Sequence, residues 1–414
     1  MARDKGIEKK LNTTMYKTWN ADAMDLGIYI HIPFCAKKCD YCDFLSGPST
    51  TEERKAYFDA LIQEIKQYRG KVASYLVRTI FIGGGTPSVV DSSYIIKIME
   101  CIKEVFQIDE QGLEATIEIN PGTVNKEKLL DYKKAGINRI SFGLQSAKDE
   151  ELKLLGRIHS YQQFVENYNL ARELGFHNIN IDLMSALPGQ TLMSWEETLH
   201  NVIGLNPEHI SAYSLIIEEG TKFYERYQEG SEGSKCLPDE ETDRLIYHST
   251  KKILKNNGYD RYEISNYSRE GFACRHNLSY WIGTEYLGFG LGASSYFNGA
   301  RFSNVDELGS YIDIMDKIDQ HGKEDSMEEL RKDYRPLTNE ERMEEFMFLG
   351  LRVSSGISIE EFTKRFSIPI NEIYGKVLDE LAQKKLVHVE GDLIKLTEYG
   401  VDISNYVLAE FLLD

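Results

Sequence analysis

The sequence predicts an α/β fold, a partial (βα)6 barrel followed by a C-terminal winged-helix-like, α-rich domain. Between residues 27 and 214, short β-branched runs alternate with longer amphipathic stretches, which is typical of βα units. Cysteines, consecutive glycines and carboxylates fall where the runs end, and the working residues of such barrels sit at the carboxyl ends of the strands. Near the end of the chain, helical patterns precede a short β-ribbon, which predicts the winged helix.

The barrel is expected to contain six strands. They are expected at residues 27–32, 77–82, 115–119, 138–143, 178–183 and 208–214. The amphipathic stretches between them are expected to form helices at 52–70, 92–106, 125–134, 161–174 and 194–204. Because successive βα units connect with right-handed crossovers, six of them give a parallel sheet that curves into most of a barrel. Residues 1–26 show no clear period and are expected to be a lead-in.

The composition favours a cytoplasmic protein that does not bind nucleic acid. The 414 residues include 48 Lys and Arg against 66 Asp and Glu, a formal net charge of −18, so the surface should repel phosphates. No apolar run approaches the roughly 20 residues that span a bilayer, and the N-terminal residues lack the apolar core of a signal peptide. Six cysteines, three of them in one loop, suit a reducing compartment and predict no disulfide.

The first predicted strand runs directly into the triplet C-x3-C-x2-C, formed by Cys35, Cys39 and Cys42. Three soft thiolates at this spacing suit a [4Fe–4S] cluster, in which three irons are held and the fourth stays free for another ligand. A structural zinc site and three reduced thiols are the alternatives. A closed zinc site needs four ligands, and no fourth presents itself nearby, because the other cysteines are scattered singly and His31 lies on the strand itself.

Later strands also end in residues suited to a ligand. Three glycines follow the second strand, and glycine is costly unless the backbone takes a positive φ or touches a ligand; a tight turn is the alternative. Carboxylates and an amide end the next strands, where each should meet hydroxyls, amides, a cation or a structural partner. An arginine after the fourth strand could bind a carboxylate or form a surface ion pair. These residues are Gly83, Gly84, Gly85, Thr86, Glu118, Gln145, Arg157 and Asp182.

Two further regions follow the barrel. Residues 259–300 are rich in aromatic side chains and glycine and have no clean helical period, which predicts strands and loops forming a flat apolar surface across the barrel mouth, or aromatic packing between domains. An acidic connector is expected near 306–345. Helices are then expected at about 338–353, 358–366 and 370–385, before a β-ribbon at 386–396. The third of these helices lacks the basic face that DNA contact requires, so we expect a packing or partner module.

Several motifs together resemble those of one family. They are HIPFCAKKCDYCDF, GGGTPS, EINP, FGLQS, LGRIHS, DLMSALPGQT and YEISNYSREGFACRHNLSYW. The cysteine spacing and the tyrosine before the last cysteine are similar to those of the radical S-adenosylmethionine (SAM) superfamily. In that superfamily SAM chelates the open iron and is split reductively to a 5′-deoxyadenosyl radical. Within it, the chain resembles the oxygen-independent coproporphyrinogen III oxidase-like proteins over roughly residues 27–414.

The resemblance implies cofactors and the residues that hold them. It assigns the cluster to Cys35, Cys39 and Cys42. It assigns SAM to Tyr29, Tyr41, Gly84, Gly85, Thr86, Glu118, Gln145, Arg157 and Asp182. Haem is expected at His276, Asn277, Tyr280 and Trp281, because imidazole is a common haem ligand and the two aromatic rings could pack on a porphyrin face. A structural histidine near a domain junction is the alternative for His276.

The same family contains a coproporphyrinogen dehydrogenase and haem chaperones that resemble it but bind haem and pass it on. The dehydrogenase has a fourth cysteine two residues after the third, where this chain has Phe44, and a longer segment before its cysteine loop. The pattern H-N-x-x-Y-W at residues 276–281 matches the chaperones. We therefore expect a haem chaperone, or alternatively a radical SAM enzyme acting on a tetrapyrrole, such as the dehydrogenase or a methylase or haem-degrading relative.

The expected partners follow from this hypothesis. They are haem or a related tetrapyrrole and an unidentified haem-acceptor protein, with any peripheral membrane association only through a partner. The expected domains are the lead-in at 1–26, a radical SAM partial barrel at 27–258, the aromatic extension with its acidic connector at 259–336 and the winged-helix-like domain at 337–414.

Overall fold

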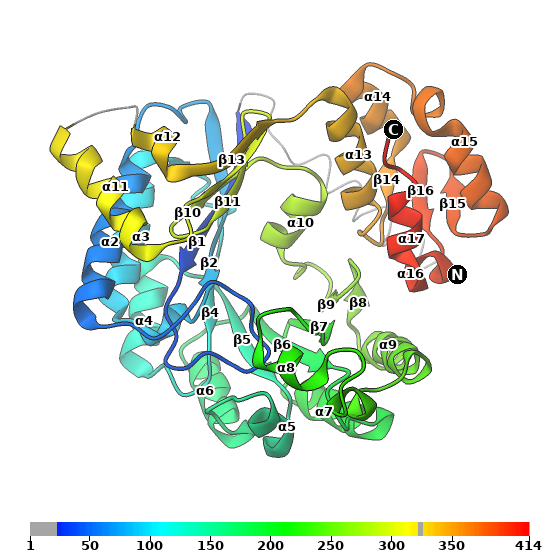
Figure 1. Cartoon of the computed structure of the whole chain (residues 1–414), viewed down its shortest axis with the longest axis horizontal. Helices are drawn as coiled ribbons and strands as arrows, with labels where there is room; N and C mark the ends of the chain where they lie inside the picture. The colour runs from blue at the N-terminus through cyan, green and yellow to red at the C-terminus, as the bar shows by residue number, and fades with distance from the viewer. Residues whose placement is uncertain (1–22, 322–325, 414) are drawn as a thin grey trace.

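The computed structural model describes residues 23–321 and 326–413. Six parallel strands lie in chain order at the centre of its main sheet (Figure 1). They are β1 (Met24–Ile32), β2 (Tyr75–Gly84), β4 (Glu114–Ile119), β5 (Arg139–Gln145), β6 (Ile179–Ser185) and β7 (His209–Ser214). Each coincides with a predicted strand, so the partial (βα)6 barrel is confirmed. Most of the predicted lead-in, residues 1–22, lies outside the described residues.

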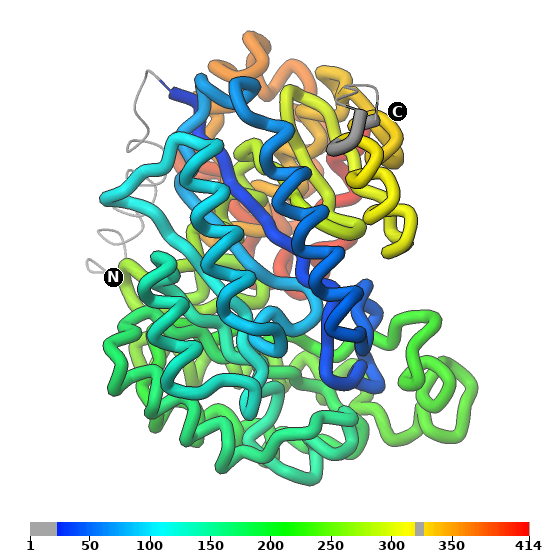
Figure 2. The backbone as a smooth tube through the Cα atoms, turned by 90° about the vertical axis from the view of Figure 1, so that its left-hand side faces the viewer, coloured from blue at the N-terminus to red at the C-terminus, as the bar shows by residue number. Residues whose placement is uncertain are grey.

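Helices between the strands cover the outer face of the sheet. They are α2 (Thr51–Lys66), the 3-10 turn η1 (Pro87–Val89), α3 (Ser92–Val105), α4 (Lys126–Ala135), α5 (Asp149–Leu154), α6 (Tyr161–Glu173) and α7 (Leu192–Gly204). Figure 2 shows α2 and α3 side by side across the first strands. Local sequence fixes where they begin: Thr50 and Glu53 form a reciprocal capping box on α2, which satisfies N–H groups that have no partner within the helix.

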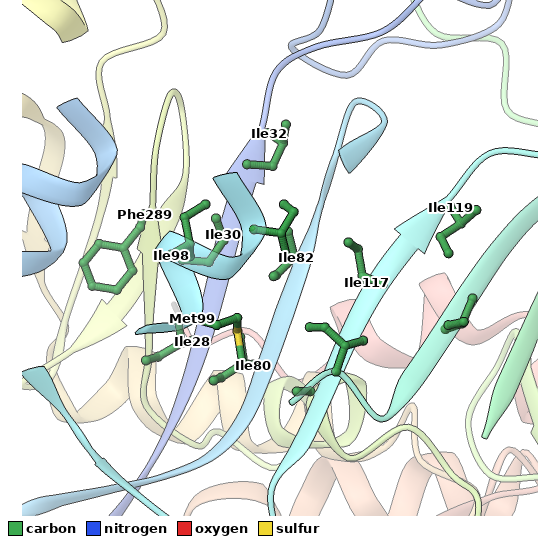
Figure 3. Packing of buried hydrophobic residues seen from close by; sticks show 14 of the residues in the cluster. Ile28, Ile30, Ile32, Ile80, Ile82, Ile98, Met99, Ile117, Ile119 and Phe289 are labelled. Atoms are coloured by element: carbon green, nitrogen blue, oxygen red, sulfur yellow. The ribbon is translucent and has the colours of Figure 1, made fainter. Parts of the chain in front are cut away.

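The core between sheet and helices explains why polar side chains face the inside of the barrel. Ile28, Ile30 and Ile32 of β1 are fully buried and pack toward Ile98 and Met99 of α3 (Figure 3). Because successive side chains of a strand point to opposite faces, the residues between these isoleucines face the interior of the barrel. The alternation of the first strand therefore directs Tyr29 and His31 toward the site.

The sheet continues beyond the barrel at both edges. Beside β7 lie β9 (Asn266–Ser268) and β8 (Asp260–Arg261); beside β1 lie β10 (Tyr286–Phe289), β11 (Ser294–Phe297), β12 (Ala300–Asn304) and β13 (Arg331–Pro336). A two-residue strand, β3 (Gln107–Ile108), pairs with β2. The connecting helices are α8 (Lys222–Tyr227), the 3-10 turn η2 (Gly233–Cys236), α9 (Glu240–Asn256), α10 (Arg275–Trp281), α11 (Leu308–His321) and α12 (Ser326–Leu330).

This extension shows how two predicted regions are built. Residues 259–300 contain strands and loops, as expected; the strands lengthen the sheet at its two edges, and residues 275–281 form the helix α10. The contact of Trp281 with Arg352 agrees with the alternative of aromatic packing between domains. The short length of α10 explains why no helical period was visible. The segment expected as an acidic connector, 306–345, contains α11, α12, β13 and the start of the next helix at residue 339, and α11 packs against α2.

The C-terminal module has its own hydrophobic core. Its elements are α13 (Asn339–Gly350), β14 (Ile357–Ser358), α14 (Ile359–Phe366), α15 (Ile370–Gln383), β15 (Val387–Glu390), β16 (Leu393–Leu396), α16 (Glu398–Asp402) and α17 (Ser404–Ala409). The three strands pair in the order β14-β16-β15, as the predicted winged-helix-like order requires. No helix in the described part of the chain has the length and apolar character needed to cross a membrane.

Candidate functional site

The cysteine loop begins directly after β1 and is closed by backbone hydrogen bonds. Cys35 N donates to Gly47 O at 2.9 Å, and Gly47 N donates to Pro33 O at 3.0 Å. The thiols of Cys35, Cys39 and Cys42 form no disulfide. Among the described residues, no three candidate ligands converge on a single metal ion. Three unpaired thiols on one loop suit a [4Fe–4S] cluster, in which each thiolate bonds a different iron.

A second anchor holds the middle of the loop against the barrel. Asp40 N donates to Leu155 O at 3.1 Å, and Asp40 O accepts from Phe223 N at 2.9 Å. The Asp40 carboxylate also pairs with Lys222 at 3.2 Å and Arg226 at 3.0 Å. Sequence reasoning missed this residue, although an acid between two cysteines was a visible signal. The loop is therefore fixed to the end of the helix that follows β5 and to a helix that follows β7.

Hydrogen-bond donors from neighbouring strand ends surround the cysteine sulfurs. Thr86 Oγ1 lies 3.4 Å from Cys35 Sγ, and Arg157 Nη1 donates to Cys39 Sγ at 3.6 Å. Asn120 joins the two donors, because its side chain donates to Thr86 Oγ1 at 2.7 Å and accepts from Arg157 Nη2 at 2.8 Å. Hydrogen bonds to sulfur and a nearby cation favour thiolates and tune an iron–sulfur cluster. Asn120 was not predicted as a site residue, although it stands at the end of β4.

The glycines after β2 serve close packing within the protein. Gly84 has a φ of +107°, and a Cβ on it would lie 2.6 Å from the ring of His31. A Cβ on Gly85 would lie 2.8 Å from Phe34 O, while Gly85 N donates to Ile32 O at 2.8 Å. A side chain at Gly84 would push the His31 ring away, and a side chain at Gly85 would push away the backbone that leads from β1 into the cysteine loop. Both glycines therefore help to position the loop, a role that the prediction of a bare ligand surface did not include.

Two carboxylates lie inside the barrel near this loop. Glu118 accepts a hydrogen bond from Gly84 N at 3.1 Å, and burial, with a smaller contribution from Asp182, raises the pKa of Glu118 to about 8. Asp182 accepts from Ser141 Oγ at 3.0 Å and Asn180 Nδ2 at 2.7 Å. Burial also raises the pKa of Asp182. An enclosed carboxylate with so high a pKa is suited to a ligand that brings hydroxyl or cationic groups.

The remaining predicted SAM residues lie around the same strand ends. Tyr29 Oη lies 3.0 Å from His31 Nδ1, and His31 Nε2 lies 2.9 Å from Leu45 O at the end of the cysteine loop. His31 was not predicted to have a role, yet its ring links Tyr29 of β1 to the end of the cysteine loop at Leu45. Tyr41 packs edge-to-face on Phe223 with ring centroids 6.3 Å apart. Gln145 ends β5 with a φ of +74°, an unusual conformation for a residue with a side chain.

The four residues predicted for haem lie elsewhere, on α10. His276 is 1% exposed, its Nδ1 lies 2.8 Å from Thr79 Oγ1, and its Nε2 lies 2.8 Å from Tyr280 Oη. The backbone N–H of His276 donates to Glu114, the first residue of β4, which places α10 at the barrel end opposite the cysteines. Burial lowers the pKa of His276 to about 3. Both ring nitrogens of His276 are therefore hydrogen-bonded within the protein, which favours the alternative of a structural histidine, and iron ligation by His276 stays a prediction.

The other members of that motif are also held within the protein. Trp281 lies under the guanidinium of Arg352, whose Cζ is 4.6 Å from the ring centroid. Tyr280 packs edge-to-face on Tyr286, with ring centroids 4.6 Å apart. Asn277 lies on the same short helix and is partly buried. The motif at 276–281 therefore joins the barrel to the following strands and the C-terminal module.

Comparison with known proteins agrees with this geometry. The sequence model of the Radical SAM superfamily matches residues 29–202, and that of the HemN C-terminal domain matches residues 337–403. "Heme chaperone HemW" of Bacillus subtilis is 38% identical over 384 residues, covering 93% of this chain and 98% of the relative. The chain belongs to the HemW family. HemW of Lactococcus lactis is 36% identical, covering 93% of this chain and 97% of the relative.

A solved structure extends the comparison to the whole fold of this HemW family member. The coproporphyrinogen III oxidase HemN of Escherichia coli, described as a radical SAM enzyme, superposes with a TM-score of 0.80 at 25% identity. The match covers 94% of this chain and 91% of HemN. The cofactors of the radical SAM superfamily are a [4Fe–4S] cluster and SAM, so the family membership agrees with the chemistry of the cysteine loop.

Proposed function

We propose that this protein is a haem chaperone that binds a [4Fe–4S] cluster, SAM and haem and passes haem to an acceptor protein. The proposal is supported by similarity to heme chaperones over nearly their whole length and by the intact thiol triplet. A coordinated cluster with SAM would supply one-electron chemistry. The acceptor is a protein partner, the location is the cytoplasm, and contact with a membrane occurs only through a partner.

Specific residues are proposed to hold the two resident cofactors. Cys35, Cys39 and Cys42 bind the cluster, with Thr86 and Arg157 donating to its sulfur ligands. SAM is proposed to contact Tyr29, Tyr41, Gly84, Gly85, Thr86, Glu118, Gln145, Arg157 and Asp182. The support is that all of these lie on the cysteine loop, inside the barrel or in the loops that follow its strands. The enclosed carboxylates would accept hydrogen bonds from ligand hydroxyls, and the arginine would pair with a ligand carboxylate.

The observation that carries the chaperone proposal is Phe44. It occupies the position of the dehydrogenase's fourth cysteine, and 62% of its surface is exposed. A phenyl ring can neither bind iron nor transfer a proton, so the chain lacks a group that the dehydrogenase places beside its cluster. An exposed apolar ring on the cluster loop also suits contact with a partner.

The decisive experiment measures what happens to the tetrapyrrole. Anaerobically reconstituted, reduced protein is incubated with SAM and either haem or coproporphyrinogen III, and the tetrapyrrole is recovered for mass spectrometry. A chaperone returns haem and coproporphyrinogen with unchanged masses and transfers haem to an apo-haemoprotein. Loss of two carbon dioxide molecules from each coproporphyrinogen would refute the proposal.

A second candidate is a radical SAM enzyme that modifies a tetrapyrrole. It is favoured by the hydrogen bond that Arg157 donates to Cys39 Sγ and by the contact of Thr86 Oγ1 with Cys35 Sγ, because such control of the cluster suits redox chemistry. The same mass measurement tests it. A changed tetrapyrrole mass that requires both SAM and reductant would establish the enzyme, and productive SAM cleavage would appear as 5′-deoxyadenosine.

A further inference from the structure

A cavity lies at the barrel end opposite the cysteine loop. Its volume is about 480 Å³, within the range of roughly 300–1,000 Å³ typical of small-molecule sites. The wall includes Leu26 of β1, Tyr262, and Leu278 and Ile282 at α10. A second cavity of about 360 Å³ shares Tyr262 and Leu278 and reaches the C-terminal module. The wall therefore combines apolar side chains with charged ones, and its volume is that of a small-molecule site.

Three arginines of this wall are available to an anion. Arg261 donates to a tyrosine hydroxyl, Arg269 to a side-chain amide and a backbone carbonyl, and Arg275 to a backbone carbonyl. None of the three has an ion-pair partner among the carboxylates of residues 23–321 and 326–413. Guanidinium groups bind carboxylates through paired, charge-assisted hydrogen bonds. The cavity thus combines apolar walls with guanidinium groups that are bound only to neutral oxygens.

Acidic residues are also present, but they are engaged differently. Arg78 is neutralised by Asp25, at 2.7 Å, and by Asp109. Asp25 also feels the charge of Arg275. Asp260 lies 3.9 Å from a lysine, and the remaining acid of the wall, Glu270, is exposed. The carboxylates of the wall therefore leave Arg261 and Arg269 free of direct ion pairs.

We propose that this cavity binds a porphyrin, with the ring against α10 and the two propionates at Arg261, Arg269 and Arg275. The inference rests on the proposed haem-carrying function and names a place for haem away from the cluster. It also gives residues 276–281 a role in haem binding without iron ligation. The helix lines the cavity through Leu278 and its neighbours, whereas the imidazole on the same helix is occupied inside the protein.

The composition of the wall indicates which part of a porphyrin the cavity would recognise. The described residues that line the cavity include no histidine, cysteine or methionine, which are the usual haem-iron ligands apart from tyrosine. The hydroxyl of Tyr262 is occupied, because it lies 2.8 Å from His209 Nε2 and accepts from Cys274 N at 3.3 Å. Recognition therefore depends on the ring and the propionates, and metal-free protoporphyrin IX is expected to bind as tightly as haem.

The test titrates the full-length protein, with its cluster reconstituted anaerobically, with haem, protoporphyrin IX and mesoporphyrin dimethyl ester. The variants are Arg261→Gln, Arg275→Gln and Thr284→Trp, the last of which adds bulk to the cavity wall. Arg244→Gln is the matched control, because it removes the same charge from an exposed position on α9. Each wall arginine variant should weaken porphyrin binding about tenfold, Thr284→Trp should weaken it more, and the control should bind as the wild type does.

The outcomes separate this cavity from the proposed function. Haem binding by the wild type that is unchanged in all three cavity variants would refute the cavity and leave the chaperone proposal standing. If the wild type bound the dimethyl ester as tightly as protoporphyrin IX, recognition of the propionates by the arginines would be refuted. If haem bound but protoporphyrin IX did not, iron ligation would be required and the proposal would be refuted. No binding of any porphyrin to the wild type would refute the haem-carrying function itself. Circular dichroism of each variant establishes that it is folded.

Discussion

Glu118→Gln should stabilise the cluster-free protein, increasingly so as the pH rises. The carboxyl group of Glu118 lies inside the barrel with Asp182 nearby, and it accepts a hydrogen bond from Gly84 N at 3.1 Å. Burial raises its pKa from 4.5 to about 8 in the folded protein. Glutamine has nearly the same shape and keeps an oxygen for the glycine N–H, but it carries no charge to desolvate.

The sign and size of the effect follow from the two pKa values. Below pH 4.5 the carboxyl is protonated in both the folded and the unfolded chain, so its favourable contribution to folding is fully present. As the pH rises through about 8 this contribution is lost, because the unfolded chain ionises freely and the folded chain does not. At about 1.4 kcal/mol for each pH unit the upper bound is about 5 kcal/mol. Water entering the barrel reduces it, and we expect about 1–2 kcal/mol.

The assay is urea unfolding of the cluster-free protein at pH 5, 7 and 9. The free energy of unfolding of the variant should be higher than that of the wild type. The difference should be small at pH 5, larger at pH 7 and largest at pH 9. Glu127→Gln on the exposed first turn of α4 is the matched control and should show no such trend. A margin that is independent of pH, or a variant less stable than the wild type at pH 9, would refute the pKa assigned to Glu118.

Three other predictions address the two ends of the barrel. A variant with Cys35, Cys39 and Cys42 all changed to Ala should bind no cluster; iron and sulfide analysis after anaerobic reconstitution checks this, and about four irons per chain would contradict it. Arg157→Ala should weaken SAM binding about tenfold to a hundredfold with the cluster retained, whereas unchanged affinity by calorimetry would remove Arg157 from the site. His276→Ala should lower the free energy of unfolding by about 2–4 kcal/mol, because two buried hydrogen bonds are lost, and it should leave the haem Soret band unchanged. A changed Soret band in a folded variant would indicate that His276 binds the haem iron.

The barrel was predictable because its pattern is local. Isoleucines alternate along β1 and pack against α3, and helix starts such as Thr50 are marked by capping residues. The sheet edges were not predictable in the same way. Strands β8 and β9 have two and three residues, too few to show a period, and β10 joins β1 only because the chain returns from far away in sequence.

The candidate site shows the same division. Cysteine spacing and the residues at strand ends are visible in sequence, because the carboxyl ends of parallel strands meet at one edge. The bridging roles of Asn120 and His31 are not visible, since each depends on which side chains from other strands lie within hydrogen-bond distance. The triple glycine could be read as a ligand surface or as tight packing, and the close approach of the His31 ring to Gly84 supports packing.

The burial of His276 changes how the motif at 276–281 is to be understood. A haem ligand must offer a free nitrogen at a surface that the porphyrin can reach, whereas both nitrogens here are bound to Thr79 and Tyr280. Releasing one would break a buried hydrogen bond at a cost of about 1–3 kcal/mol. The start of α10 is held separately, because the backbone N–H groups of Arg275 and His276 donate to the carboxylate of Glu114. In the proposed porphyrin cavity, the motif would therefore serve as a rigid wall. In that role, its histidine would fix the helix to the barrel, while Leu278 and Ser279 line the cavity.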